Sequence, residues 1–301
     1  MRKEPRALLG CLGVAALTLT GCSAGAGATA ASDPTSPITV ATIPLSDDPS
    51  AENPIDVFGE LLSEQTGREV EITDVPDYLS VVEAVRAGHV DIGLMSGFPS
   101  ALAVNTGEVD ALVAFEGTDE PVSTCVVLPE SPITTVEDLR GATVAFADPA
   151  SSSGYFMPVF MLHQAGLEKD VDYEAIFAGG HEGSFVALAE GQVDAACTAV
   201  ILTKMGEPYF PFAEGEWRGV GESPSMPLVG AVLGRTDLDR ATRTQLMEAL
   251  PVVFDASNKE ALGAIGDFAG RPVLVDPEPS AFSGFVEIAD VAGVTLEDLD
   301  R

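Results

Sequence analysis

A pattern of ten residues occurs twice in the chain, and it constrains the fold more than any other feature. Residues 84–93 (AVRAGHVDIG) and 187–196 (ALAEGQVDAA) align without a gap as A-[VL]-x-x-G-x-V-D-[IA]-[GA]. In each copy the apolar spacing predicts a helix that ends at glycine and is followed directly by a strand. Two lobes built on one plan would explain the repeat. A chance likeness between two helix–glycine–strand junctions is the alternative.

A strand–helix–strand pattern precedes each copy. The predicted elements are a strand at 38–43, a helix at 54–66 and a strand at 69–72, then a strand at 143–147, a helix from about 154 to 165 and a strand at 173–177. Strands linked by helices in this order are typical of parallel sheets. The predicted fold is therefore α/β, with two lobes that are each a mainly parallel sheet flanked by helices.

Three further strand-like runs indicate where the chain passes between the lobes. They lie at 111–115, 123–128 and 227–233. Two crossings would form a two-strand hinge, with lobe one at 38–118 plus 228–301 and lobe two at 119–227. A ligand that contacts both lobes would close them. The C-terminal stretch 237–301 is expected to pack on lobe one.

The N-terminus has the features of an export signal. A basic start is followed by an apolar run over 7–19, which predicts a signal peptide at 1–21. The order Leu19-Thr20-Gly21-Cys22 resembles the bacterial lipobox, in which the cysteine becomes lipidated. An ordinary secretory signal cleaved within 24–31 is the alternative.

Residues 22–37 are rich in Ala, Gly, Ser, Thr and Pro, which predicts a lipidated, flexible tether. Export is expected with either kind of signal. With the lipobox, the protein is expected at the outer face of the bacterial cytoplasmic membrane, anchored by lipid at Cys22.

Composition argues against several functional classes. With 15 Lys+Arg against 47 Asp+Glu, the net charge is -32, which disfavours binding to nucleic acid. Three His and four Cys without CxxC or HExxH spacing indicate neither a metal site nor a metal cofactor. We expect no cofactor.

The strongest local motif follows the predicted strand at 143–147. The chain continues through Asp148-Pro149 to three consecutive serines, Ser151, Ser152 and Ser153, at the start of a helix. Hydroxyls and unpaired backbone N–H groups at a helix N-terminus bind anions without a cation. The alternative is that the serines only cap the helix.

Two aromatic side chains occupy the corresponding helix starts of the two repeats. His181 lies in the loop before the second helix and would donate a hydrogen bond to an oxyanion; a solvated surface histidine is the alternative. Tyr78 begins the first helix and would face the ligand if the lobes are pseudo-symmetric; an aromatic core residue is the alternative.

Catalysis is not expected. Ser152, His181 and Glu182 would be needed as nucleophile, base and orienting acid, but neighbouring His and Glu residues do not easily form a relay. The chain also has no G-x-S-x-G nucleophile motif.

The order of these motifs resembles a known family. D-P-x-S-x-S-G-x-x-x-P at 148–158, then G-x-H-E, then the second A-[LV]-x-x-G-x-V-D, is similar to the phosphonate-, phosphite- and phosphate-binding lipoproteins of ABC importers, the PhnD-like group. The resemblance covers essentially all of 38–301. It implies a type II periplasmic-binding fold. The implied oxyanion ligands are Ser151, Ser152, Ser153 and His181 from lobe two and Tyr78 from lobe one.

The implied function is capture of a small phosphorus oxyanion, namely a phosphonate, phosphite or phosphate. The implied partners are an ABC permease and its ATPase, and a lipid anchor would attach the protein to the membrane. No nucleic-acid partner is expected, and the protein is expected to be a monomer. A binding protein for a sulfonate or other organic anion, or a ligand-sensing receptor without transport, is the alternative.

Two departures from the family pattern bear on the ligand. Family members commonly have G-P-[FL]-S-Y where this chain has residues 96–100, so Ser100 replaces an aromatic hydroxyl and is expected among the ligand-binding residues. The carboxylate that aminoalkylphosphonate binders place after the second V-D strand falls on Ile201 here. An amine-bearing ligand would lack its counter-ion, which favours a small oxyanion or a phosphonate with an apolar substituent.

Cys125 and Cys197 are the remaining cysteines of interest. Export places them in an oxidising compartment, which favours a disulfide. In type II lobes the strands that carry them would be neighbours. Two buried, unpaired thiols are the alternative.

Overall fold

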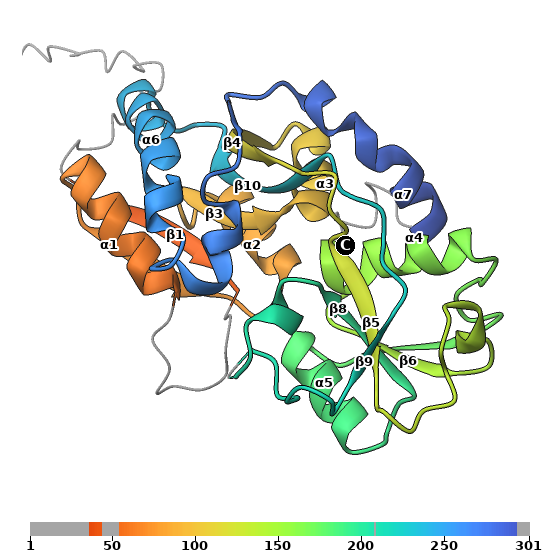
Figure 1. Ribbon diagram of the computed structural model, residues 1–301. Coiled ribbons are helices and arrows are strands. Elements are labelled where there is room, and N and C mark those ends of the chain that lie inside the picture. The colour runs from red at the N-terminus through yellow and green to blue at the C-terminus, as the bar shows by residue number, and fades with distance from the viewer. Residues whose placement is uncertain (1–35, 44–53, 208, 294–301) are drawn as a thin grey trace, which may run out of the picture. The chain divides into compact units, whose positions relative to one another are not determined.

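The structure is a computed structural model that describes residues 36–43, 54–207 and 209–293 (Figure 1). The predicted signal peptide, Cys22 and nearly all of the tether lie outside the described residues. The described chain forms two β-sheets with helices packed on them, so the α/β class is as expected. We refer to each sheet and the helices on it as the six-stranded lobe and the five-stranded lobe.

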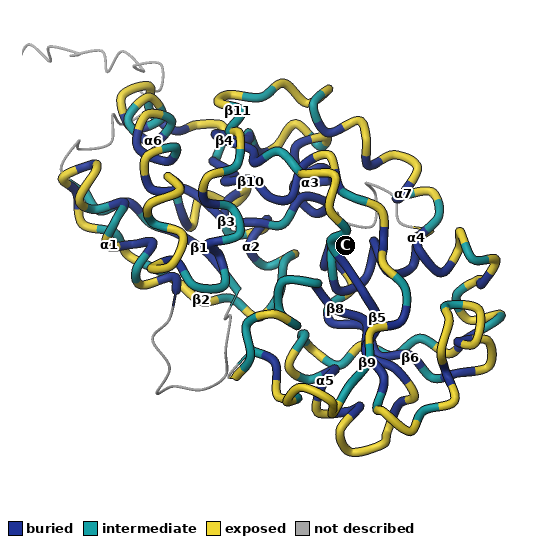
Figure 2. The backbone as a smooth tube through the Cα atoms, in the orientation of Figure 1, coloured by how far each residue is buried: buried dark blue, intermediate teal, exposed yellow. Residues whose placement is uncertain are grey.

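The six-stranded lobe contains the first and last elements of the chain. Its sheet order is β11 (Val273–Val275), β4 (Val109–Glu116), β10 (Leu228–Arg235), β3 (Ile92–Ser96), β1 (Ile38–Thr42) and β2 (Val70–Asp74). Its helices are α1 (Pro54–Thr66), α2 (Tyr78–Arg86), α3 (Gly97–Thr106) and α6 (Arg240–Val253), with the 3-10 turns η4 (Ala256–Asn258), η5 (Gly263–Phe268) and η6 (Pro279–Phe285). The last helix, α7 (Val286–Ala292), follows η6. Consecutive residues of β3 and β10 are buried, so helices cover both faces of this sheet (Figure 2).

The helix α1 illustrates how the sequence forms this layer. Proline is favoured in the first turn, and the buried residues Ile55, Phe58 and Leu62 recur at helical spacing. The helix ends before Gly67, whose φ of 68° a residue with a side chain rarely adopts. The predicted and observed bounds agree.

The five-stranded lobe is made by the middle of the chain. Its sheet order is β7 (Glu174–Phe177), β6 (Thr143–Phe146), β8 (Ala195–Ala199), β5 (Ser123–Val127) and β9 (Arg218–Val220). Its helical elements are η1 (Glu137–Leu139), the π-helical turn η2 (Ser152–Phe156), α4 (Met157–Gln164), α5 (His181–Ala189) and η3 (Leu202–Lys204).

The two faces of this sheet have different cores. Val126 and Ala196 pack with Phe185 of α5, whereas their neighbours Cys125 and Cys197 belong to the larger core that includes Phe156 of η2. Because side chains alternate along a strand, α5 and the η2–α4 segment lie on opposite faces.

Both sheets are mixed, and most strands of each sheet run in one direction, as expected for mainly parallel sheets. β1 pairs in parallel with β2 and β3, and β6 with β7 and β8. The strands next to the crossings, β4, β5, β9 and β10, pair antiparallel with their neighbours. β5 and β10 are the strands that the chain forms directly after crossing from the other lobe, and each is antiparallel to both of its neighbours.

The sequence repeat is present in three dimensions. α2 and α5 have nine residues each, and the strands that follow them, β3 and β8, have five each. The repeated aspartates hold neighbouring strands: the Asp91 carboxylate accepts from the N–H and hydroxyl of Thr39 (3.0 and 3.1 Å), and that of Asp194 accepts from the N–H of Thr143 (2.8 Å). The repeat is therefore one structural unit used twice.

The two crossings between the sheets run side by side. The N–H of Gly117 donates to the carbonyl of Pro227 (2.9 Å), and Ser123 and Ser223 exchange two hydrogen bonds (2.9 and 3.0 Å). A Cβ at Gly117 would lie 1.7 Å from the carbonyl oxygen of Met226. Glycine is required at this position because two backbones approach each other there.

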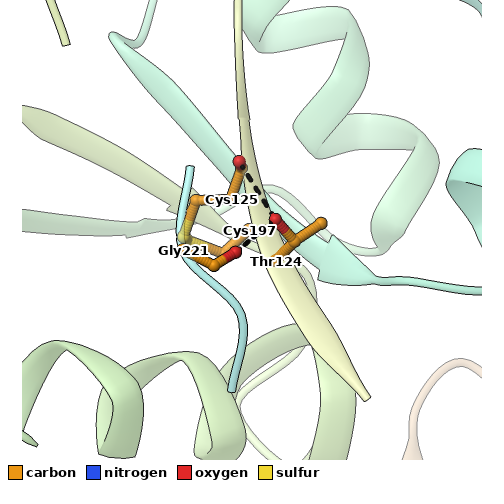
Figure 3. The surroundings of a disulfide bond; sticks show 4 residues. All are labelled: Thr124, Cys125, Cys197 and Gly221. Atoms are coloured by element: carbon orange, nitrogen blue, oxygen red, sulfur yellow. Dashed lines mark hydrogen bonds between the residues drawn. A yellow bond between two sulfur atoms is a disulfide. The ribbon is translucent and has the colours of Figure 1, made fainter. Parts of the chain in front are cut away.

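A disulfide joins Cys125 and Cys197, which are register partners on β5 and β8 (Figure 3). The two residues are 72 apart in the sequence. Next to the bond, the hydroxyl of Thr124 donates to the carbonyl of Gly221 (2.6 Å), which ties β5 to the segment after β9 (Figure 3).

The C-terminal elements only partly follow the prediction that they pack on lobe one. α6 packs on α1 and β4, and η6 packs on α3, all within the six-stranded lobe. α7, however, packs on α4 and η2 of the five-stranded lobe. The predicted helix at 281–291 is in fact η6 followed by α7, and this segment contacts both lobes. Among the described residues, none of the helices has both the length and the apolar character needed to cross a membrane.

Candidate ligand-binding site

The turn after β6 carries the three predicted serines. Asp148 accepts a hydrogen bond from the N–H of Ala150 (2.7 Å), and Ser151 caps the next helix by accepting from the N–H of Gly154 (3.0 Å). This helix begins as the π-helical η2 before it continues as α4. Short π-helical segments leave the regular hydrogen-bond pattern and are frequent at functional sites.

Gly154 allows the ring of His181 to lie against η2. A Cβ at this position would be 2.5 Å from Cβ of Ala147 and 2.9 Å from Cε1 of His181. Any side chain here would displace one of them. The glycine of the motif therefore brings the serine turn and the histidine together.

His181 is the first residue of α5, and a strand residue holds its ring. Nδ1 of His181 lies 2.8 Å from Oγ1 of Thr198 on β8, and Thr198 is completely buried. Burial lowers the pKa of His181 to about 4. The ring is consequently neutral at pH 7 and has one N–H to donate.

Tyr78 is the first residue of α2, the position that His181 has in the second repeat. Asp77 caps this helix by accepting from the N–H of Ser80 (2.7 Å). The two repeats thus present a tyrosine from the six-stranded lobe and a histidine from the five-stranded lobe.

The phenol of Tyr78 lies among hydroxyls from both lobes. Burial raises the pKa of Tyr78, hydrogen bonding to Ser96 and Ser151 acts in the opposite direction, and the negative charge of Asp148 raises it further. Ser96 ends β3, and Ser151 caps η2, so residues from three elements meet at this phenol.

Ser152 connects the two lobes directly. Its Oγ accepts a hydrogen bond from the N–H of Phe98 at the start of α3 (2.7 Å) and donates one to Oγ of Ser96 (3.0 Å). The rings of Phe98 and Phe156 stack next to it with centroids 3.5 Å apart, and Phe285 of η6 meets Phe98 edge-on at 5.8 Å. A polar and an aromatic contact therefore join α3 to η2.

Two carboxylates lie at the same junction. Burial raises the pKa of Asp148, and the negative charge of Asp77 raises it further, while the hydrogen bond from Ala150 opposes both. A ligand here would meet hydroxyl and N–H donors together with negative charge. This combination favours an oxyanion that itself carries a proton on oxygen.

The structure brings together four of the predicted site residues and places one, Ser100, inside a helix. Tyr78, Ser151, Ser152 and His181 lie in the group described above. Ser100 is buried within α3, where its hydroxyl donates to the carbonyl of Ser96 (2.8 Å). The hydroxyl of Ser153 is partly exposed and has no hydrogen-bond partner within the described ranges.

Three residues of the group were not predicted from the sequence. They are Ser96, Phe98 through its backbone N–H, and Thr198. Ser96 and Thr198 lie near the ends of the strands that follow the two V-D motifs, so the signal was their position at the carboxyl edge of each sheet. Among the described residues, no group of three or more His, Cys, Asp or Glu side chains is arranged to hold a metal ion.

Comparison with known proteins agrees with this architecture. Residues 40–272 match the sequence profile of the family described as ABC transporter, phosphonate, periplasmic substrate-binding protein. The chain belongs to this family. The resemblance noted in the sequence is thereby confirmed.

Individual relatives match shorter parts of the chain. The Phosphate-import protein PhnD of Mycolicibacterium smegmatis is 33% identical over 171 residues, which are 52% of this chain and 53% of the relative. The Phosphonates-binding periplasmic protein of Escherichia coli is 25% identical over 198 residues, 64% of this chain and 58% of the relative. The chain thus spans between half and three-fifths of the curated relatives that it matches.

A solved structure shows the same fold. PhnD1 from Prochlorococcus marinus in complex with methylphosphonate superposes with a TM-score of 0.71 at 18% identity, covering 87% of this chain and all of that chain. The fold is therefore that of type II periplasmic-binding proteins.

Proposed function

We propose that this chain is an extracytoplasmic substrate-binding lipoprotein of an ABC importer. It would capture a small phosphorus oxyanion between its lobes and deliver it to a permease. The observation that carries the proposal is that the phenol of Tyr78 from one lobe lies at Ser151 of the other, and that the ring of His181 lies against the same serine turn. A ligand that accepts hydrogen bonds from both sides stabilises the closed arrangement.

The chemistry of the group supports an oxyanion held by neutral donors. The capped start of η2 and the phenol of Tyr78 supply hydrogen bonds, and the neutral ring of His181 supplies one more. Tetrahedral phosphorus oxyanions offer several acceptor oxygens to such donors. The carboxylate of Asp148 would in addition accept a hydrogen bond from a P–OH group. Sulfate and sulfonates have no proton on oxygen at neutral pH and could not donate this bond.

The proposal includes the organisation and location of the protein. The lobes would extend over 38–118 plus 228–301 and over 119–227, and a lipid on Cys22 would anchor the protein outside the cytoplasmic membrane. An ABC permease and its ATPase would receive the ligand from a monomeric, non-catalytic binding protein. A Cys22→Ser variant expressed in a bacterium should leave the membrane fraction and appear in the soluble extracytoplasmic fraction; retention in the membrane would contradict the anchor.

The decisive experiment is a calorimetric titration of residues 33–301. The ligand set is phosphate, phosphite, methylphosphonate, aminoethylphosphonate, sulfate and taurine. We expect one-to-one binding of at least one phosphorus oxyanion and none of sulfate or taurine. Binding of a sulfonate alone would contradict the proposed ligand but not the fold. Absence of binding by every compound would contradict the proposed function.

Matched variants assign the site. Tyr78→Phe and His181→Ala each remove one hydrogen bond to the anion, so each should weaken binding by about 1.5–3 kcal/mol. Ser257→Ala serves as the control, because Ser257 lies in η4 and its hydroxyl donates to Asp255 (2.6 Å) rather than to a residue of the group. Unchanged affinity of the Tyr78→Phe/His181→Ala double variant would refute the assignment.

A further inference from the structure

The contact between Thr198 and His181 has a consequence for how the proposed ligand is bound. His181 begins α5, which packs on β8, and its Nδ1 lies 2.8 Å from Oγ1 of Thr198. The Thr198 side chain is fully buried, so water does not compete for its hydroxyl. One nitrogen of the ring is therefore committed to the strand.

The edge of the His181 ring that carries Cε1 faces the serine turn. Cε1, the ring carbon bonded to both nitrogens, faces η2, because a Cβ on Gly154 would come within 2.9 Å of it. Ser151 Oγ would lie 2.9 Å from that same Cβ. With Nδ1 turned to Thr198, Nε2 is the nitrogen left for a ligand at this turn.

A neutral imidazole has a proton on one nitrogen only. If the proton is on Nε2, the ring donates to an anionic oxygen, and Nδ1 accepts a hydrogen bond from Thr198. If the proton is on Nδ1, a lone pair on Nε2 faces the oxygen and repels it. The hydroxyl of Thr198 is able to donate to Nδ1, so it can partner the Nε2–H form that an anionic oxygen favours.

We propose that Thr198 is a positioning residue that donates its hydroxyl proton to Nδ1 of His181 and so holds the ring as the Nε2–H tautomer, ready to donate to the ligand oxyanion. This inference rests on the proposed oxyanion-binding function. The site then recognises an unprotonated oxygen by a directed hydrogen bond without a positive charge.

The chain offers a matched set of variants. Thr198→Val keeps the shape and removes the hydroxyl, whereas Thr198→Ser keeps the hydroxyl. Thr124→Val is the control, because Thr124 is the register partner of Thr198 on β5 and its hydroxyl donates to the carbonyl of Gly221 rather than to a histidine.

The first readout needs no ligand. Nitrogen-15 NMR of histidine-labelled protein (residues 33–301) distinguishes the two tautomers, and a His181→Gln variant identifies the His181 signals among the three histidines. We expect the Nε2–H form in the wild type, Thr198→Ser and Thr124→Val, and a mixture in Thr198→Val. An Nδ1–H form in the wild type would overturn the inference whether or not any variant folds.

The second readout is affinity for the phosphorus oxyanion that binds the wild type most tightly in the titration. Thr198→Val should raise the Kd about tenfold, and Thr198→Ser and Thr124→Val should stay within about twofold of the wild type. A Thr198→Val variant that binds as tightly as the wild type would overturn the inference. Absence of binding by the wild type would instead refute the proposed function, while the NMR result would still test the Thr198–His181 contact.

Discussion

Three consecutive hydroxyls, at Ser151, Ser152 and Ser153, have three different environments. Ser151 caps η2 and reaches the phenol of Tyr78. The hydroxyl of Ser152 hydrogen-bonds to Phe98 and Ser96 of the other lobe, and Ser153 is partly exposed. At the residue scale, the same amino acid thus serves as cap, as link between lobes and as surface residue within one turn.

The link made by Ser152 should be measurable as stability. Ser152→Ala leaves the buried N–H of Phe98 without its partner, so the free energy of unfolding in urea should fall by about 1–3 kcal/mol. Ser153→Ala should change it by no more than about 0.5 kcal/mol. Equal effects of the two variants would mean that the contact between Ser152 and Phe98 is not formed in solution.

His181 should make stability depend on pH. Its pKa is about 4 in the folded protein and near 6.5 in the unfolded chain, so between these values the unfolded chain binds more protons. Stability should therefore fall as the pH is lowered from 7 to 4, by up to about 3 kcal/mol. Asp148, whose pKa is raised, acts in the opposite sense.

Because Asp148 is present in both chains, the test is the difference between wild type and His181→Gln in urea unfolding at pH 7, 5.5 and 4.5. The wild type should lose more stability than the variant as the pH falls. Parallel pH dependence in the two proteins would show that the pKa of His181 is not lowered in the folded protein.

The sequence predicts the residues that begin helices better than those within strands. Tyr78 and His181 were found because the repeat places them at equivalent helix starts. Ser96 and Thr198 lie within short, buried strands, where hydroxyl residues are common and carry no separate signal. Their roles depend on contacts across the lobes and between α5 and β8, which apolar spacing does not encode.

At the scale of elements, most predicted strands and helices are present with bounds close to those expected. The helix predicted from about 154 differs, because its first turn is the π-helical η2. That turn is shaped by its packing against Phe98 and His181, both distant in sequence. The packing of α7 on α4 also could not be predicted from the sequence. An amphipathic pattern indicates that one face of a helix is buried, but not which element covers that face.

The crossing at Gly117 makes an element-scale prediction. Gly117→Ala places a methyl group 1.7 Å from the carbonyl oxygen of Met226, and this backbone atom cannot give way without separating the crossings. We expect a loss of several kcal/mol in urea unfolding or failure to fold. Gly219→Ala is the control, because its Cβ would meet Oγ1 of Thr124 at 3.4 Å. A Gly117→Ala protein as stable as Gly219→Ala would show that the crossings are not in contact.

For the whole molecule, the net charge of -32 sets the electrostatic environment in which the proposed anion must bind. Repulsion acts over about 30 Å at 0.01 M salt and about 10 Å at 0.1 M. Added salt should therefore tighten binding of the oxyanion, the reverse of a site built on Lys or Arg.

The measurement is calorimetry with phosphite or phosphate at increasing concentrations of sodium gluconate, whose bulky anion should not enter the site. Sodium chloride in parallel reveals competition by a small anion. Binding that weakens with gluconate would indicate that cations attract the ligand and would contradict the role of neutral donors.

The contact of α7 with α4 limits how the lobes can move. The paired crossings by themselves would act as one axis, and two rigid bodies joined along an axis rotate freely about it. The C-terminal segment adds an attachment that does not belong to the crossings, since η6 holds α3 while α7 holds α4. Rotation of the lobes must slide or detach one of these contacts and expose apolar surface there. Exposing that surface costs free energy, so opening the lobes has a cost whether or not a ligand is bound.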